Sequence, residues 1–196
     1  SSFFMNTYDL IQDMTFSQAR DWTAGTKVTY HVKDWFSVTG SLHADFYDRF
    51  KRHERIDKRQ KDYESSIYQP RLTVTSNYFN GHSLILGMEH TSDELTSDRF
   101  SGNANHDLKT RALKETEYFL QDEWTINPRW MISVGIRTNF SKAFGFMGMP
   151  KVAAKYSPDK HWSLRANYSM GYRSPSIKEL FFNWDHLGMF MIRGNE

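Results

Sequence analysis

The sequence predicts an all-β fold, an antiparallel up-and-down meander of about eight or nine long strands. We expect it to be a partial segment of a large transmembrane β-barrel, because three observations agree. Apolar and polar residues alternate with a period of two through most of the chain, as in strands that bury one face. Short turns alternate strictly with long hydrophilic connections. Aromatic residues flank nearly every short turn, which matches the girdle that a membrane barrel carries at its interface.

The first four predicted strands form two hairpins. Val28 and Val32 share a face in the first strand, and Val38 and Leu42 share a face in the second. The third and fourth strands meet at Asn80-Gly81, a dipeptide typical of tight hairpin turns. Because the apolar residues on both sides of each turn are even-numbered, a connection of odd length keeps them on one face of the sheet. These strands are expected at about residues 22–32, 36–47, 71–79 and 84–88.

The last four predicted strands repeat the pattern. They are expected at about residues 118–126, 130–137, 151–156 and 162–173, and the last has the longest alternation. One position fits poorly, because the apolar parity turns Asp122 outward and Phe119 inward, so we expect a β-bulge there. The chain before about Ala19 is expected to hold part of another strand and a loop. The aromatic residues gather at one end of these strands, which a soluble sandwich has no reason to do: Tyr30, Trp35, Phe36, Tyr78, Phe79, Trp124, Trp130, Tyr156 and Trp162.

The free energy of placing charge in lipid decides which face points outward. An Arg or Lys on the lipid face near the midplane costs ~2–4 kcal/mol. Turning the sheet over would place several such residues in lipid, and their sum would exceed a typical total stability of ~5–15 kcal/mol. The apolar face is therefore expected to meet lipid and the polar face a lumen. The polar face carries Lys27, Arg71, Arg137, Lys155 and Arg165.

Composition narrows the classes of protein. The 196 residues suffice for one domain, and the formal net charge of +2 gives no indication of nucleic-acid binding. The absence of cysteine excludes disulfides and a thiol nucleophile. Mean hydropathy is −0.68, and no apolar run approaches the ~18 residues of a membrane helix. No signal peptide opens the chain and its last residues resemble the middle of a loop, so we expect a fragment of a mature exported protein.

Two loops and several histidines are candidates for binding. The stretch Phe50–Asp62 mixes both charge signs and is expected to be a solvated loop; contact with anionic lipopolysaccharide or an anionic ligand is the alternative. Residues 92–110 are expected to form a mobile exposed loop. His31 and His43 fall on the lumen face, as hydrogen-bonded lining residues or as ligand contacts, without the spacing of a metal site. No Ser-His-Asp arrangement or catalytic motif is recognisable.

The segment Gly171-Tyr172-Arg173-Ser174-Pro175-Ser176-Ile177-Lys178-Glu179-Leu180 resembles an element of TonB-dependent outer-membrane receptors, in which a barrel strand ends in a Gly-aromatic-Arg-small-Pro-Ser-x-x-Glu-Leu sequence. Gly194-Asn195 resembles the Gly-Asn that follows after a loop, and residues 118–137 resemble a mid-barrel hairpin of that family. Tyr172 and Ser174 replace the commoner Phe and Ala. Pro175 would stop the strand, and Ser176-x-x-Glu179 is a capping box that would start a short helix. The motif is therefore expected to shape a junction between strand and loop.

The resemblance implies a wide outer-membrane barrel that is closed by an N-terminal plug and powered through the TonB complex. Residues 1–196 would be a partial barrel without the plug or the C-terminal strands. The implied cargo is a scarce nutrient such as haem, a ferric siderophore or cobalamin, bound without covalent chemistry, a resident cofactor or a structural metal. Haem is favoured because haem receptors of this family carry a histidine in the interval that His186 occupies here. The expected ligand-binding residues are His186, Arg137, Arg165, Arg173 and His43.

Two other classes of protein compete with this interpretation. An outer-membrane barrel enzyme would need clustered acidic, His and Ser residues at the loop rim, and the sequence has no such cluster. A soluble β-sandwich that binds sugars or adheres to surfaces would bury the apolar face in a core, so the isolated domain would dissolve without detergent.

Overall fold

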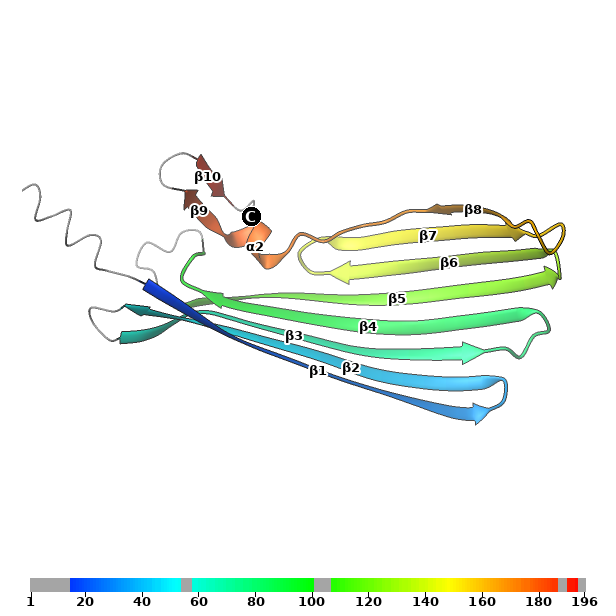
Figure 1. Ribbon diagram of the computed structural model, residues 1–196, viewed down its shortest axis with the longest axis horizontal. Helices are drawn as coiled ribbons and strands as arrows, with labels where there is room; N and C mark the ends of the chain where they lie inside the picture. Colours follow the sequence, from blue (N-terminus) through cyan, green and yellow to red (C-terminus); the bar gives the residue numbers. More distant parts are fainter. Residues whose placement is uncertain (1–14, 54–57, 101–106, 187–189, 194–196) are drawn as a thin grey trace, which may run out of the picture.

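The computed structural model describes residues 15–53, 58–100, 107–186 and 190–193, and side chains at 17–51, 61–100 and 107–182. Eight antiparallel strands form one sheet whose spatial order is the chain order, and Figure 1 shows them side by side. The predicted fold class is confirmed. The strands are β1 (Thr15–Lys33), β2 (Phe36–His53), β3 (Lys58–Ser76), β4 (His82–Ser97), β5 (Lys109–Asn127), β6 (Trp130–Ser141), β7 (Gly145–Tyr156) and β8 (Leu164–Ser169).

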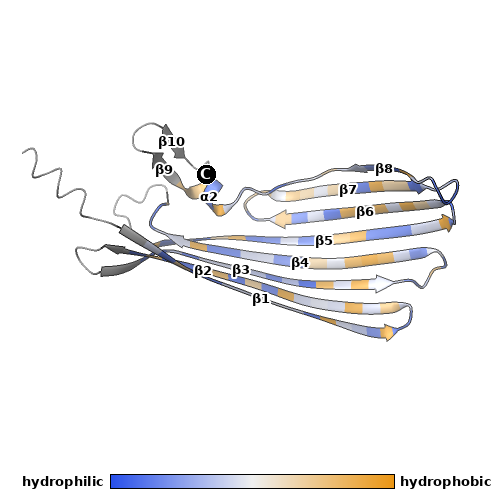
Figure 2. Ribbon diagram, viewed as in Figure 1, coloured by the Kyte–Doolittle hydropathy of each residue, from blue (hydrophilic) through white to orange (hydrophobic). Residues whose placement is uncertain are grey.

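A register that is uniform through the turn-end parts of the strands, with shifts only near three strand ends, gives the sheet one apolar face and one polar face. Even-numbered residues lie opposite even-numbered residues in successive pairs, such as Val38 with Val74 and Leu86 with Leu120. The apolar side chains of one strand therefore continue those of the next, while odd-numbered residues form the polar face. Figure 2 shows the resulting alternation of hydrophobic and hydrophilic residues along the strands. None of the described helices is long and apolar enough to cross a membrane.

Side-chain oxygens and one glycine close the short turns. Gly81 has a φ of 77°, in the left-handed region that favours glycine. The Asn127 side chain accepts hydrogen bonds from the backbone N–H groups of Arg129 and Trp130. The Asp159 carboxylate accepts in the same way from His161 and Trp162. These bonds satisfy backbone donors locally, which explains why Asn and Asp precede the strand starts.

Aromatic side chains form two rows across the apolar face rather than one. At the turns Trp35 and Tyr78 have ring centroids 4.9 Å apart, and Trp130 and Tyr156 are 4.4 Å apart. The prediction that the aromatics gather at one end was wrong, because a second row crosses the middle of the strands. Its contacts join Phe46 to Tyr68, Tyr118 to Phe140, and Phe140 to Phe146. The second row divides the sheet into a turn-end half, which carries the apolar alternation, and a loop-end half beyond it.

The strands run farther into the loop-end half than the sequence predicted. The charged stretch Phe50–Asp62 was expected to be a loop, but β2 continues to His53 and β3 begins at Lys58; residues 54–57 lie outside the described residues. Likewise β4 continues to Ser97 and β5 begins at Lys109, which shortens the expected loop at 92–110. The chain before Ala19 does contribute strand, from Thr15. Here polar residues such as Asp48 and Glu94 also occupy the outward, even-numbered face, so the strands lack the alternation that reveals strands in sequence.

The structure departs from the predicted pattern at the β6–β7 connection and at the end of β8. β6 and β7 are joined at the loop end by residues 142–144 alone, so short turns do not alternate strictly with long loops. The last predicted strand was expected to reach Arg173, but β8 ends at Ser169. Its final backbone hydrogen bond runs from the Met170 N–H to the Pro150 carbonyl, 3.0 Å. Pro150 has no N–H to return to β8, so the ladder stops beside it.

A short helical segment closes the loop-end half. After β8 the chain forms the expected short helix, α2 (Ile177–Phe181). A hairpin of β9 (Asn183–His186) and β10 (Phe190–Arg193) follows, and the sequence did not predict this hairpin. Figure 1 shows α2 at the loop ends of the strands. Ile177 packs with Tyr63, Leu95 and Phe100, and all four are buried. This cluster is the buried core of the described residues, while the apolar face of the turn-end half is exposed.

Candidate functional site

Four charged side chains cross the polar face of the turn-end half on adjacent strands. Arg71 on β3 forms an ion pair with Glu89 on β4, 2.5 Å. Arg137 on β6 forms an ion pair with Glu117 on β5, and its guanidinium also lies 4.0 Å from the Glu89 carboxylate. The glutamates occupy the middle strands and are the less exposed partners. The register places Glu89 directly opposite Glu117, so the flanking arginines offset the repulsion between two like charges.

Phe119 lies among these charges, and the structure explains its inward position. The expected β-bulge is absent, because β4 and β5 pair without a register shift from His82–Trp124 to Ser97–Lys109. Phe119 lies opposite Gly87, where a Cβ atom would come within 2.3 Å of the ring. The ring thus covers the space that glycine leaves open, and the Arg71 guanidinium lies 5.5 Å from the ring centroid. Asp122, on the apolar face, is accommodated by a 2.8 Å contact with His82 beside the turn.

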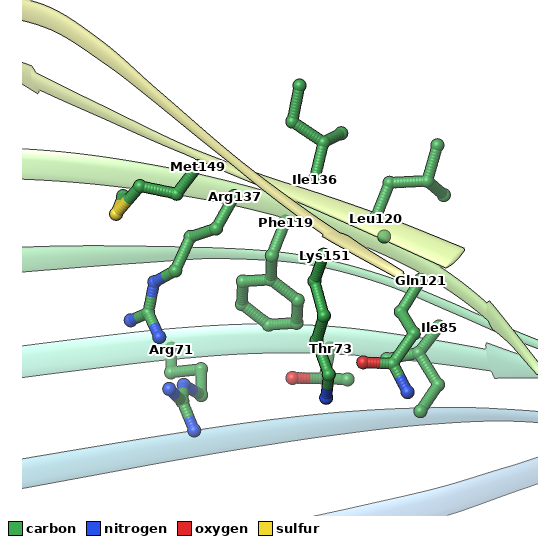
Figure 3. Close-up of a pocket in the computed structure, with 11 residues that line it drawn as sticks. Arg71, Thr73, Ile85, Phe119, Leu120, Gln121, Ile136, Arg137, Met149 and Lys151 are labelled. Carbon is green, nitrogen blue, oxygen red and sulfur yellow. The ribbon is translucent and has the colours of Figure 1, made fainter. Parts of the chain in front are cut away.

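A cavity of about 470 Å³ opens onto this network. Figure 3 shows Arg137, Phe119 and Lys151 on one side of the strands, with Ile136 and Leu120 pointing to the other side. The lining combines guanidinium, ammonium and amide donors with an aromatic ring and apolar side chains such as Ile85 and Met149. Such a surface can hold a ligand that carries both negative charge and apolar area, because Arg and Lys contact the anionic groups while the ring contacts the rest.

The family-like motif after β8 is arranged as its sequence predicted. The Ser176 hydroxyl accepts from the Glu179 N–H, and the Glu179 carboxylate accepts from the Ser176 N–H, which completes the capping box. Arg173 forms an ion pair of 2.6 Å with Glu179. The Ser176 backbone and hydroxyl, together with Arg173, lower the pKa of Glu179. Ser174 donates to Glu115 on β5, 2.9 Å, so the motif joins the loop to the sheet.

A buried carboxylate anchors the strands beneath α2. Between Arg49 and Phe50 the pairing of β2 with β3 shifts by one residue, and Asp62 is the unpaired residue on β3. Asp62 is 3% exposed and forms ion pairs with Arg49, 2.8 Å, and Lys51, 3.1 Å. Burial alone would raise the pKa of Asp62, but the hydrogen bonds from Arg49 and Lys51 outweigh it and lower the pKa. Asp93 on β4 has the opposite balance, since burial raises its pKa and Lys178 only partly opposes this.

The predicted ligand-binding residues do not converge on one cavity. Arg137 lines the central cavity, and Arg165 lines a different one at the turn end. His43 lies on the polar face of β2 between Gly25 and Gln69, and Arg173 lies in the segment that precedes α2. His186 is the last residue of β9, paired with Phe190; its side chain, residues 187–189 and the Gly194-Asn195 motif lie outside the described residues. Among the described residues no group of three or more His, Asp or Glu could hold a metal ion.

Sequence reasoning missed several residues of the central network. Glu89, Glu117, Phe119 and Lys151 were not identified as candidates, although all are odd-numbered within apolar alternating strands. That parity was the signal that could have found them. Their mutual contacts depend on the register between strands, which the parity of a single strand does not give.

Comparisons with known proteins give one family model, two related sequences and a structure with a similar fold. Residues 2–196 match the family model described as TonB dependent receptor-like, beta-barrel. Iron-regulated outer membrane virulence proteins from two Vibrio cholerae serotype O1 strains, Classical Ogawa 395 and El Tor Inaba N16961, are 24% identical over 160 residues. The match covers 79% of this chain and 22% of those proteins. The crystal structure of the siderophore receptor PirA from Pseudomonas aeruginosa superposes with a TM-score of 0.53 at 12% identity, covering 81% of this chain and 36% of that chain.

Proposed function

Because the chain belongs to the TonB-dependent receptor family, whose β-barrel model spans residues 2–196, we propose that it forms part of the wall of an outer-membrane importer of an iron complex. The main structural observation in support of this proposal is that the sheet has one apolar face and one polar face. Its apolar face meets the lipid of the Gram-negative outer membrane, and its polar face lines the lumen. The two aromatic rows lie about ten residues apart along the strands, which in a tilted strand spans the ~25 Å apolar band of such barrels.

The central cavity supports an anionic cargo. Arg71, Arg137 and Lys151 present cations beside the ring of Phe119, and ferric siderophores and haem combine negative oxygen groups with flat or apolar parts. The names of the relatives, an iron-regulated outer membrane virulence protein and a siderophore receptor, favour an iron complex over cobalamin. The cargo would bind by ion pairs and stacking, and release would follow energy transfer from the TonB complex through a plug. No step requires covalent catalysis.

Uptake of radioactive iron tests the proposal. Cells that lack the gene and carry it on a plasmid would be given ⁵⁵Fe as a ferric siderophore or as haemin under iron limitation. We expect uptake that depends on the plasmid, stops when an uncoupler collapses the proton gradient, and falls at least about tenfold in an Arg137→Gln variant. Lys27→Gln is the matched control, because Lys27 lies on the polar face of β1 outside the cavity. Equal uptake with and without the gene for both cargoes would contradict the proposal.

A haemin titration separates the two iron cargoes. We propose His186 as an axial haem ligand, because it lies in the loop interval that the family resemblance associates with haem. A shift of the haem absorbance band in the detergent-solubilised protein that is lost in His186→Ala would support haem. A band shift that is equal in both proteins would remove His186 from the site, and no shift in either would leave the siderophore as cargo.

A further inference from the structure

A second cavity collects unpaired positive charge at the turn end of the polar face. Its volume is about 540 Å³, and it lies between the β5–β6 turn, the end of β7 and the start of β8. Its lining includes four cationic side chains, Arg129, Lys155, Lys160 and Arg165, and one carboxylate, Asp159. This carboxylate already accepts two backbone hydrogen bonds within the β7–β8 connection. The cavity is therefore rich in donors and poor in acceptors.

These cations differ from the arginines of the central cavity. Arg71 and Arg137 each have a glutamate partner. Within the described part of the chain, none of the four cations at the turn end forms an ion pair, although all of them lie in described segments. Unpaired cations in a shared cavity repel each other, and a bound anion would remove that repulsion.

The register makes the repulsion unavoidable. Lys155 on β7 lies directly opposite Arg165 on β8, an arrangement that destabilises a strand pair. The backbone ladder between β7 and β8, from Lys151–Ser169 to Tyr156–Leu164, holds these two strands in this register. On its other side β7 is fixed to β6 and its turn, because Tyr156 packs on Trp130 with ring centroids 4.4 Å apart and the Ser157 N–H donates to the Arg129 carbonyl, 2.8 Å. The strands therefore present the two cations side by side as part of a fixed frame.

We propose that this cavity binds a phosphate group. Guanidinium and ammonium donors form strong charge-assisted hydrogen bonds with phosphate oxygens, and the hydroxyls of Ser157 and Ser163 also line the cavity. The donors come from several separate backbone elements, namely the β5–β6 turn, β7, the β7–β8 connection and β8. A phosphate offers three acceptor oxygens in different directions, whereas a carboxylate offers two in a plane. The geometry thus favours phosphate over an acidic peptide.

Two sources supply this chemistry. The turn-end aromatic row, including Trp130 and Trp162, marks the level of lipid headgroups, so the phosphate can belong to an anionic phospholipid of the adjoining leaflet. It can also belong to a soluble phosphorylated compound that enters the lumen from the turn side. Both would contact Lys155 and Arg165 first, because these residues share the polar face at the strand ends.

Calorimetric titration of the intact, detergent-solubilised protein with inorganic pyrophosphate tests the site. We expect saturable binding that weakens at least about tenfold in the Lys155→Gln/Arg165→Gln double variant, since each charge-assisted bond contributes about that factor. Lys27→Gln, another lysine of the polar face, should bind as the wild type does. Lys155→Arg keeps the charge and should retain binding, which guards against a folding defect in the double variant.

No saturable binding to the wild type, or equal binding to the double variant, would overturn the proposal. Tighter binding of hexaglutamate than of pyrophosphate would also overturn it, in favour of an acidic peptide. Native mass spectrometry identifies the source. Phosphatidylglycerol that copurifies with the wild type and is reduced in the double variant indicates a headgroup. Pyrophosphate binding with equal lipid retention in both proteins indicates a soluble phosphate compound.

Discussion

The two halves of the sheet are stabilised in different ways. In the turn-end half the outward side chains, such as Val134 at 52% exposed and Leu86 at 51%, are half exposed, and we expect lipid to cover them. In the loop-end half Leu95 and Ile177 are each 2% exposed, because α2 covers the polar face of β3 to β5. The same strands thus rely on the membrane in one half and on a small protein core in the other. Substitutions should therefore act separately on the two halves.

Ile177→Ala should have the largest effect, confined to the loop-end half. Removing a buried isoleucine typically costs ~2–5 kcal/mol, here from the docking of α2 rather than from the barrel. Limited proteolysis should cut the segment around α2 faster, while the thermal unfolding of the strands stays unchanged. Met170→Ala, in the same segment but 54% exposed, is the control. An equal drop in barrel stability for Ile177→Ala would show that the two halves unfold together.

Leu86→Arg should destabilise the turn-end half by ~2–4 kcal/mol, because it places a charge on the lipid face. Glu94→Arg, on the same face of the same strand but in the loop-end half, should change stability little, since that position is exposed beyond the second aromatic row. Urea unfolding in lipid vesicles measures both variants. Similar losses would mean that the lipid extends past the second aromatic row.

Gly87→Ala should cost ~1–3 kcal/mol through overpacking. Its Cβ would lie 2.3 Å from Phe119 and 2.7 Å from the Leu72 backbone oxygen, which cannot move aside. Gly40→Ala, also within the turn-end half, meets nothing within 4 Å and should be neutral or slightly stabilising. The same unfolding assay compares them. A neutral Gly87→Ala would mean that the ring of Phe119 does not lie over the glycine.

Acidification should change the stability of the loop-end half through two groups that act in opposite directions. Asp62 has a lowered pKa, so its stabilising ion pairs are present above the normal carboxylate pKa and are lost as the pH falls through the lowered value. Asp93 has a raised pKa, so the cost of burying its charge is present at neutral pH and is relieved as the pH falls. The measurement is the hydrogen-exchange protection of β3 and β4 as a function of pH. The loss of protection at low pH that Asp62 causes should disappear in Asp62→Asn, and the gain that Asp93 causes should disappear in Asp93→Asn.

Sequence reasoning succeeded where lipid imposes a pattern. The alternation through Trp22–Val32 and Leu84–Met88 reflects one face in lipid and one in a lumen, so it located the turn-end strands, the apolar face and Arg137. It failed for Phe50–Asp62, whose described residues belong to β2 and β3 and carry polar side chains on both faces. The capping box at Ser176 was predictable because its partners lie three residues apart. The second aromatic row was not, because its members come from different strands and meet only through the register.

The sequence by itself determined the fold class, the division of residues between an apolar and a polar face, and the family, since periodicity, turn residues and local motifs are all short-range features. The tertiary structure alone decided which charges are neutralised. Arg71 and Arg137 acquire glutamate partners from neighbouring strands, while Lys155 and Arg165 lie opposite each other and form no ion pair with any residue that the structure describes. The physical reason is that ion pairing depends on the few ångströms between adjacent strands, and the register that sets this distance is fixed by packing across the whole sheet.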